Sequence, residues 1–167
     1  MRNGTLLLGG LLLAATSLGC DPPPPAKAPN PTRTLDERRA IEVIRNAVAA
    51  EGARPAAARE ETLTNSGKPI RIDVSVDGRK FGLVYVSDED RSALGAVLPE
   101  PNKKDESLKI LRAGADGTIV LVLLYQSNYR YDDLVGSGHE QTVITAENEL
   151  ARDVRYAVVG ANTRKWE

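Results

Sequence analysis

A polar stretch at Gln126–Glu140, QSNYRYDDLVGSGHE, holds the side chains best suited to chemistry. Three of them are the carboxylates Asp132, Asp133 and Glu140, and a fourth is His139, the only histidine of the chain. Carboxylates and imidazole are the groups that general acid–base catalysis uses, and function concentrates in loops that a rigid scaffold positions. These four residues are the candidate catalytic set if the protein is a hydrolase or binds a small ligand.

The spacing of these groups matches no established catalytic or metal motif. A single histidine excludes a metal site built on a histidine pair. Ser137 precedes His139 by two residues, but the sequence around it lacks the G-x-S-x-G spacing of a nucleophile elbow. The acidic clusters at 88–90 and 132–133 lack the D-x-D-x-D-G spacing of a calcium loop. The sequence therefore predicts no metal, no cofactor and no complete catalytic set.

The same stretch also contains a candidate binding surface. Tyr129 and Tyr131 lie two positions apart and share one face of an extended chain, with Arg130 on the other face. Tyrosine and arginine are enriched where proteins contact each other. The alternative is that both tyrosines continue an edge strand and pack on the core, with Asp132 and Asp133 as solvated turn residues. A single sequence does not show which face is buried, so both interpretations stay open.

Helical patterns begin and end the part of the chain that can fold. Thr34 and Glu37 fit a capping box, and Gly52 ends the run that follows. Its apolar residues recur at helical spacing: Ala40, Ile41, Val43, Ile44, Ala47 and Val48. A last helix is predicted over 141–159 and is closed by Gly160. Its inward residues are expected to be Ala146, Leu150, Val154, Ala157 and Val158.

Strand patterns lie between these helices and form two hairpins. In the first, apolar and polar residues alternate before Asp77-Gly78, which fits a two-residue turn. On the strand that follows, Phe81, Leu83 and Tyr85 share one face, with Val84 and Val86 on the other. In the second, six consecutive apolar residues indicate a central strand that is covered on both faces. The strands are expected at 70–76, 81–86, 108–112 and 119–124. Short helices are expected at 54–61, from Pro55, and at 88–96, where Ser87 and Asp90 can cap the start.

The order helix, hairpin, short helix, hairpin, helix predicts an α+β fold. We expect an antiparallel sheet of about four strands, formed by the two hairpins, with the helices packed on it. Residues 34–160 form one domain in this prediction, because their number suits a single core, and residues 161–167 form a loose C-terminal tail.

The chain begins with a positive charge at Arg2, an apolar run over 6–15, small residues and its only cysteine, Cys20. The run is shorter than the about 20 apolar residues that a membrane span needs, and its order is typical of a secretory signal. Its end, Leu18-Gly19-Cys20, resembles the lipobox of bacterial lipoproteins. The resemblance implies that residues 1–19 are removed and that Cys20 carries a diacylglyceryl thioether and an acylated amino group. The alternative is an ordinary secretory signal that leaves Cys20 as a free thiol.

Asp21–Pro31, DPPPPAKAPNP, is rich in proline and predicts a semi-rigid spacer of roughly 30 Å, at about 3.1 Å per residue. We therefore assign residues 20–33 to the lipidated cysteine and its tether. Residues 1–19 contain Arg2 and no acid, so 21 basic residues stand against 23 acidic ones in residues 20–167, a net charge of −2. A near-neutral surface argues against nucleic acid as a partner, since nucleic acid favours a basic face.

These observations predict a lipoprotein anchored to a membrane of the cell envelope, inner or outer, and facing the periplasm. We expect its folded part to be a non-catalytic binding or assembly module that contacts another envelope protein. The contact is expected on Gln126–Glu140 or on the exposed strand of the 70–86 hairpin. The alternative is a hydrolase or small-ligand binder that acts on envelope material through the carboxylates of the 126–140 loop.

Overall fold

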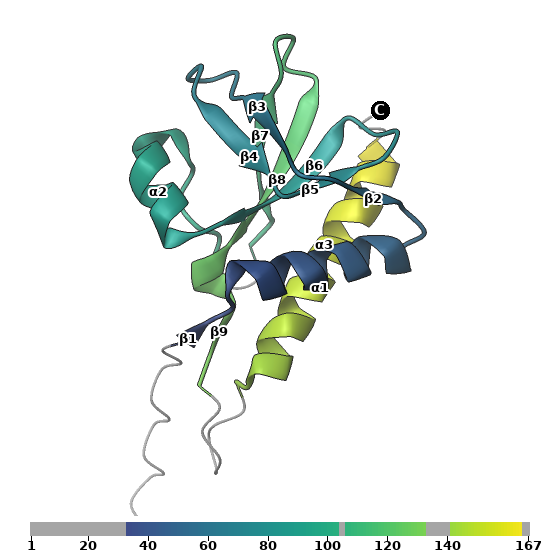
Figure 1. Cartoon of the computed structure of the whole chain (residues 1–167), viewed down its shortest axis with the longest axis vertical. Helices are drawn as coiled ribbons and strands as arrows, with labels where there is room; N and C mark the ends of the chain where they lie inside the picture. Colours follow the sequence, from purple (N-terminus) through teal and green to yellow (C-terminus); the bar gives the residue numbers. More distant parts are fainter. Residues whose placement is uncertain (1–32, 104–105, 133–140, 165–167) are drawn as a thin grey trace, which may run out of the picture.

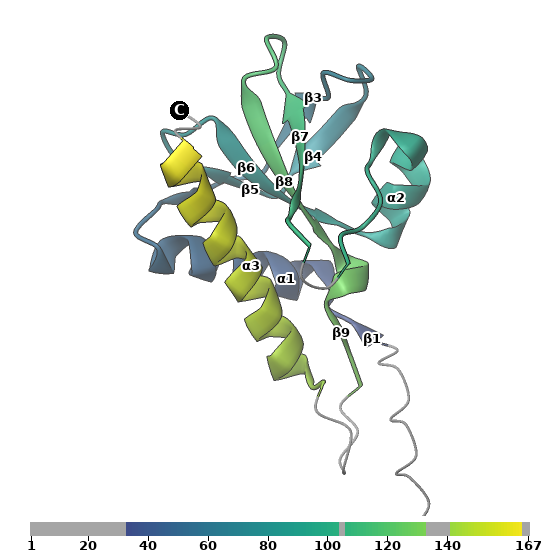
Figure 2. The same cartoon turned by 180° about the vertical axis from the view of Figure 1, so that it is seen from behind.

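The computed structural model describes residues 33–103, 106–132 and 141–164, and in these ranges the α+β prediction is confirmed (Figures 1 and 2). The α-helices are α1 (Glu37–Ala50), α2 (Asp88–Leu94) and α3 (Val143–Arg164), and 3-10 turns lie at Gly95–Val97 and Gln126–Asn128. The strands are β1 (Arg33–Thr34), β2 (Pro55–Ala56), β3 (Arg59–Thr62), β4 (Pro69–Ile72), β5 (Val74–Val76), β6 (Phe81–Val86), β7 (Lys109–Ala113), β8 (Ile119–Tyr125) and β9 (Arg130–Tyr131).

The main sheet has the strand order β2-β5-β6-β8-β7. Both predicted hairpins are present, because β5 pairs antiparallel with β6 and β7 pairs antiparallel with β8. However, β8 lies between β6 and β7 and runs parallel to β6, so the prediction of a purely antiparallel sheet is wrong. The cause is the composition of β8, IVLVLLY, because a continuously apolar strand is best stabilised at the centre of the sheet, where both faces are covered.

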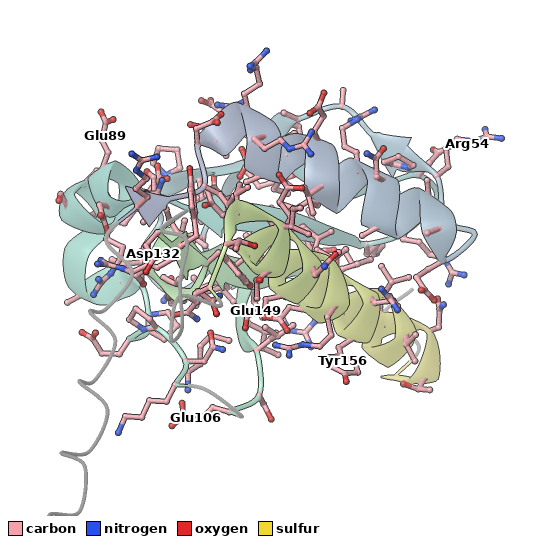
Figure 3. The ribbon with its side chains drawn as sticks, turned by 90° about the horizontal axis from the view of Figure 1, so that it is seen from below. Arg54, Glu89, Glu106, Asp132, Glu149 and Tyr156 are labelled. Carbon is pink, nitrogen blue, oxygen red and sulfur yellow. The ribbon has the colours of Figure 1, made fainter. Side chains whose placement is uncertain are left out.

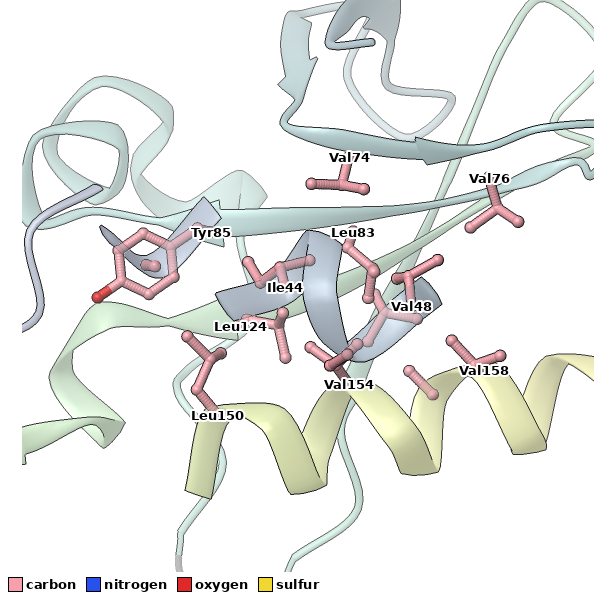
Figure 4. Close-up of a cluster of buried hydrophobic side chains, with 14 of the residues drawn as sticks. Ile44, Val48, Val74, Val76, Leu83, Tyr85, Leu124, Leu150, Val154 and Val158 are labelled. Atoms are coloured by element: carbon pink, nitrogen blue, oxygen red, sulfur yellow. The ribbon is translucent and has the colours of Figure 1, made fainter. Parts of the chain in front are cut away.

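The helices α1 and α3 cover one face of this sheet and enclose the larger core (Figure 4). Most of the predicted apolar stripes are buried, and Figure 4 shows Ile44, Val48, Leu150, Val154 and Val158 between the helices and the strands. Two residues of the predicted α1 stripe, Ile41 and Val43, are only partly buried, and Ala161 joins the core from outside the predicted stripe. The buried residues are Ala40, Ile44, Ala47 and Val48 of α1 and Ala146, Leu150, Val154, Ala157, Val158 and Ala161 of α3. Burial of each Val, Leu or Ile side chain is worth about 1.5–3 kcal/mol, so the packing of the helices on the sheet dominates the stability of this layer.

A second core lies on the other face of the strands. Its members are Leu63, Ile70, Ile72, Val84, Val86, Leu98, Ala113, Leu121, Leu123 and Tyr125. The β3–β4 pair lies over this face, and the end of β3 is hydrogen-bonded to β7: the N–H of Thr64 donates to the oxygen of Arg112 (3.0 Å) and the N–H of Gly114 to that of Thr62 (2.9 Å). The strands therefore curl around this cluster, and β6 and β8 are covered on both faces, as predicted for 119–124.

The predicted strand 70–76 is broken at Asp73. Its first half, β4, pairs with β3, and its second half, β5, pairs with β6 and β2. The chain crosses β6 closely at this bend, and a Cβ on Gly82 would lie 2.5 Å from Cγ2 of Ile72. Glycine at position 82 is therefore required by the close approach of the two strands.

Three local predictions are wrong. The short helix expected at 54–61 is replaced by β2 and β3, because Pro55 suits an edge strand, where no ladder bond needs its missing N–H. The N-cap of α1 is Asp36, whose Oδ1 accepts the N–H of Arg39 (3.0 Å), while Thr34 lies in β1. The turn between β5 and β6 has four residues, 77–80, rather than two.

The ends of two helices differ in how well they were predicted. The capping box of α2 is confirmed: the Ser87 side chain accepts the N–H of Asp90, and the Asp90 side chain accepts the N–H of Ser87. In contrast, α3 continues through Gly160 to Arg164, and Ala161 is buried. The tail predicted at 161–167 therefore begins within the helix, because burial of Ala161 outweighs the helix-breaking tendency of one glycine. Residues 165–167 lie outside the described ranges.

Candidate binding site

Tyr129, the first predicted contact residue, lies in the core between β9 and α3. It is 1% exposed, and its Oη donates a hydrogen bond to Oδ2 of Asp153 (3.1 Å). Its ring stacks on that of Tyr85, with the centroids 6.4 Å apart and the planes at 23°. Burial, and secondly the charge of Asp153, raise the pKa of Tyr129 well above its ordinary value. The side chain is thus enclosed by the protein and offers no surface to a partner.

The other two predicted contact residues lie on β9, which pairs antiparallel with β1: Arg33 lies opposite Tyr131 and Thr34 opposite Arg130. Tyr131 is half-buried and packs on the larger core, as Tyr129 does, whereas Arg130 is exposed. The two tyrosines thus share the inward face of an edge strand, and Arg130 lies on the outward face.

Of the four candidate catalytic residues, the structure describes only Asp132. Its side chain is 9% exposed, and its N–H donates to the carbonyl oxygen of Gln141 (3.0 Å) at the start of the segment that leads into α3. Asp133, His139 and Glu140 lie outside the described residues, and so does Cys20. The described part of the chain therefore does not bring the candidate set together.

Asp73 is a buried carboxylate that sequence reasoning did not select. It is 6% exposed, and its Oδ2 accepts the N–H of Tyr85 (2.8 Å), which the bend between β4 and β5 leaves without a strand partner. Burial raises the pKa of Asp73 to about 6, against the opposing effects of the Tyr85 N–H and of Arg71. A perturbed carboxylate can indicate an active site. Here, however, the carboxylate is bonded within the sheet, which indicates a structural role.

A pocket of about 390 Å³ lies where the C-terminal ends of α1 and α3 meet the β5–β6 turn. Apolar side chains line it from two sides, Val76 and Phe81 from the hairpin and Val158 and Ala161 from α3. Charged residues surround them, among them Arg54, which forms an ion pair with Asp77 (3.5 Å), and Glu51, which pairs with Arg155 (3.5 Å). This volume falls at the small end of the about 300–1,000 Å³ typical of ligand sites.

The outer side of α3 carries an exposed apolar face. Among the described residues, three of the four exposed large apolar side chains lie on this helix: Ile144 (66%), Tyr156 (66%) and Val159 (48%). Arg152, Tyr156 and Val159 are spaced by four and three residues and therefore share one face of the helix. Figure 3 shows Tyr156 on the side of α3 that points away from α1. We call these three residues the α3 outer face. Its sequence signal was available, since Tyr156 and Val159 fall outside the predicted inward stripe.

Comparison with known proteins gave no match to this chain among family models, curated proteins or solved structures. Within the described ranges no group of three or more His, Cys, Asp or Glu side chains is placed to hold a metal ion. None of the helices described is both long and apolar enough to cross a membrane.

Proposed function

We propose that this protein is an envelope lipoprotein that is anchored through lipid on Cys20 and acts as a non-catalytic binding or assembly module. The observation that carries the binding role is the α3 outer face, an exposed Tyr, Val and Arg on a helix whose other side is fixed in the core. Aromatic and arginine residues supply most of the binding energy in protein interfaces. Such a face favours another envelope protein as the partner.

The course of the chain supports the tethered arrangement. β1 opens the described part of the chain at Arg33 and is held by β9, and α3 begins beside β9. A proline-rich tether from Cys20 would therefore join the fold at this end (Figure 1). α3 has 22 residues, which at 1.5 Å per residue gives about 33 Å. Because Tyr156 and Val159 lie in its C-terminal half, the tether would hold the contact face away from the membrane.

Replacement of Tyr156 and Val159 by Ser is expected to weaken partner capture at least about tenfold, the effect of losing one contact worth about 1.4 kcal/mol. The fold is expected to persist, because both side chains are more than 45% exposed (66% and 48%). The measurement is affinity capture of the tagged full chain from detergent-solubilised envelopes.

The matched control is Ile110→Ser, which removes a similarly exposed apolar side chain (41%) from β7, outside the α3 outer face. We expect capture by the control to equal that of the wild type. Equal capture by the Tyr156→Ser/Val159→Ser variant would contradict the assignment of this face.

A further inference from the structure

The exposed side of α3 carries positive charge and no negative charge among the side chains that the structure describes. The carboxylates of the helix, Glu147, Glu149 and Asp153, are only partly exposed, whereas Arg152 and Arg155 are exposed. The exposed side chains described on this helix are Ile144, Asn148, Arg152, Arg155, Tyr156, Val159, Asn162 and Thr163. Two guanidinium groups are thus combined with apolar and aromatic side chains on the outside of α3.

Two of the α3 carboxylates are already bound by groups of the fold. Oε1 of Glu147 accepts Nε of Arg39 on α1 (2.7 Å), and Oε2 of Glu149 accepts Nε2 of Gln141 (3.0 Å). These bonds tie both acids to neighbouring segments. The charge that α3 presents to solvent is therefore set by its two arginines.

Arg152 is held in place by a carboxylate that is itself fixed to the core. Nε (3.2 Å) and Nη2 (3.1 Å) of Arg152 donate to Oδ1 of Asp153, whose Oδ2 accepts the hydroxyl of the buried Tyr129 (3.1 Å). The Asp153 side chain is 15% exposed and that of Arg152 54%. Arg155 is paired with the less exposed Glu51 in the same way (3.5 Å). A guanidinium has more N–H donors than one carboxylate oxygen takes up, so each arginine is pre-positioned and can still bind a second anion.

The number of arginines favours a protein over a lipid surface. Binding to anionic phospholipid is typical of clusters of about 4–8 Lys and Arg, and the exposed side of α3 has two among the described residues. Arginine beside tyrosine is instead typical of contacts between proteins. The planar guanidinium also matches a carboxylate, with which it forms two parallel hydrogen bonds. These observations point to the carboxylates of a protein.

Resting on the proposed function, we propose that the partner binds the α3 outer face through an acidic segment. Its carboxylates meet Arg152 and Arg155, and an apolar side chain between them packs on Tyr156 and Val159. Positions 152 to 159 span about 10–11 Å of helix, so about two turns of a partner helix are enough for the contact. The same charges repel a basic segment, and the face thereby selects its partner by charge.

Two fluorescently labelled peptides of about 18 residues test the proposal. Both carry a row of Leu at helical spacing, flanked by Glu in one peptide and by Lys in the other. Fluorescence anisotropy with the purified full chain in non-ionic detergent measures each Kd. We expect the Kd of the Glu peptide to be at least about tenfold lower than that of the Lys peptide. It should rise when NaCl is increased from about 0.05 to about 0.5 M, because salt screens exposed charges.

The double variant Arg152→Gln/Arg155→Gln is expected to raise the Kd of the Glu peptide at least about tenfold. The matched control Arg38→Gln/Arg54→Gln removes two exposed arginines outside α3 and should leave the Kd unchanged. Far-UV circular dichroism checks the fold of both. Because loss of Arg152 also leaves Asp153 without its ion pair, the single variant Arg155→Gln is measured as well, and it should raise the Kd about threefold.

Equal binding of the two peptides, or no binding of either, would overturn the proposal, and so would unchanged binding by the folded arginine variants. Vesicles test a lipid occupant. The anchor inserts alike into phosphatidylglycerol and phosphatidylcholine vesicles, so release of the Glu peptide by the anionic vesicles alone would show that the face binds lipid instead. Capture of an envelope protein through Tyr156 and Val159 is a separate measurement. Failure of the peptides with capture intact contradicts only the charge of the partner, whereas lost capture contradicts the proposed function.

Discussion

Tyr129→Ala is expected to lower the free energy of unfolding by about 3–5 kcal/mol, the usual effect of truncating a fully buried aromatic residue. The substitution removes a ring that is 1% exposed, ends its stacking on Tyr85 and deletes the donor to Asp153. Urea unfolding followed by circular dichroism measures the change. Loss of partner capture by this variant would therefore report unfolding rather than a lost contact.

Two further substitutions, at Tyr129 itself and at the adjacent Arg130, separate the loss of the ring from the loss of its hydrogen bond and from a change on the exposed face of β9. Tyr129→Phe keeps the ring and removes only the hydrogen bond to Asp153, which is worth about 1.5–3 kcal/mol when the acceptor is a carboxylate. Arg130→Ala, on the exposed face of β9, should change stability by less than about 0.5 kcal/mol. If Tyr129→Ala were as mild as Arg130→Ala, the placement of Tyr129 in the core would be wrong.

Stability is expected to fall as the pH rises from about 4 to about 6, because of Asp73. Burial raises the pKa of this carboxyl from 3.8 to about 6. Between these values the unfolded chain releases the proton and the folded chain keeps it, so the folded state binds more protons. The free energy of unfolding therefore decreases with pH across this window, by up to about 3 kcal/mol from this group. The contribution of Asp73 to the free energy of unfolding is complete below pH 3.8 and lost above about pH 6.

Asp73→Asn tests this assignment. The amide oxygen can still accept the Tyr85 N–H, but the side chain no longer titrates, so urea unfolding between pH 4 and 6 should show a flatter dependence than the wild type. At pH 8 the variant should be at least as stable, since the lost ion pair with Arg71 involves a side chain that is 57% exposed. Asp73→Ala instead leaves the Tyr85 N–H unpaired and should cost about 1–3 kcal/mol. An unchanged pH dependence in Asp73→Asn would show that another group titrates.

The elements that could be predicted are those whose signal is local. The 3.6-residue period gave the buried faces of α1 and α3, and the continuous apolar run gave the central position of β8. The bend at Asp73 could not be predicted, because Ile70, Ile72, Val74 and Val76 alternate without interruption. In the structure, however, Ile72 belongs to the second core and Val74 to the first. A pattern of period two does not show that the strand changes partners in its middle.

The candidate site shows the same limit. The sequence suggested that Tyr129 is a contact residue. Its hydrogen-bond acceptor, Asp153, is 24 positions away on another element, and no local pattern shows this pairing. The order of β6, β8 and β7 is likewise decided by contacts between distant segments. Tyr156 is the opposite case: its outward position follows from the helical period alone, and the structure adds only that the side chain is 66% exposed.

The most direct test of the central claim compares the tagged wild-type chain with a Cys20→Ala version in affinity capture from detergent-solubilised envelopes. Anchoring through Cys20 predicts that the wild type enriches an envelope protein and that the variant, which has no residue to carry the lipid, loses it. Equal enrichment by both forms would contradict the role of the lipid. The absence of a captured protein from both would contradict the binding module itself.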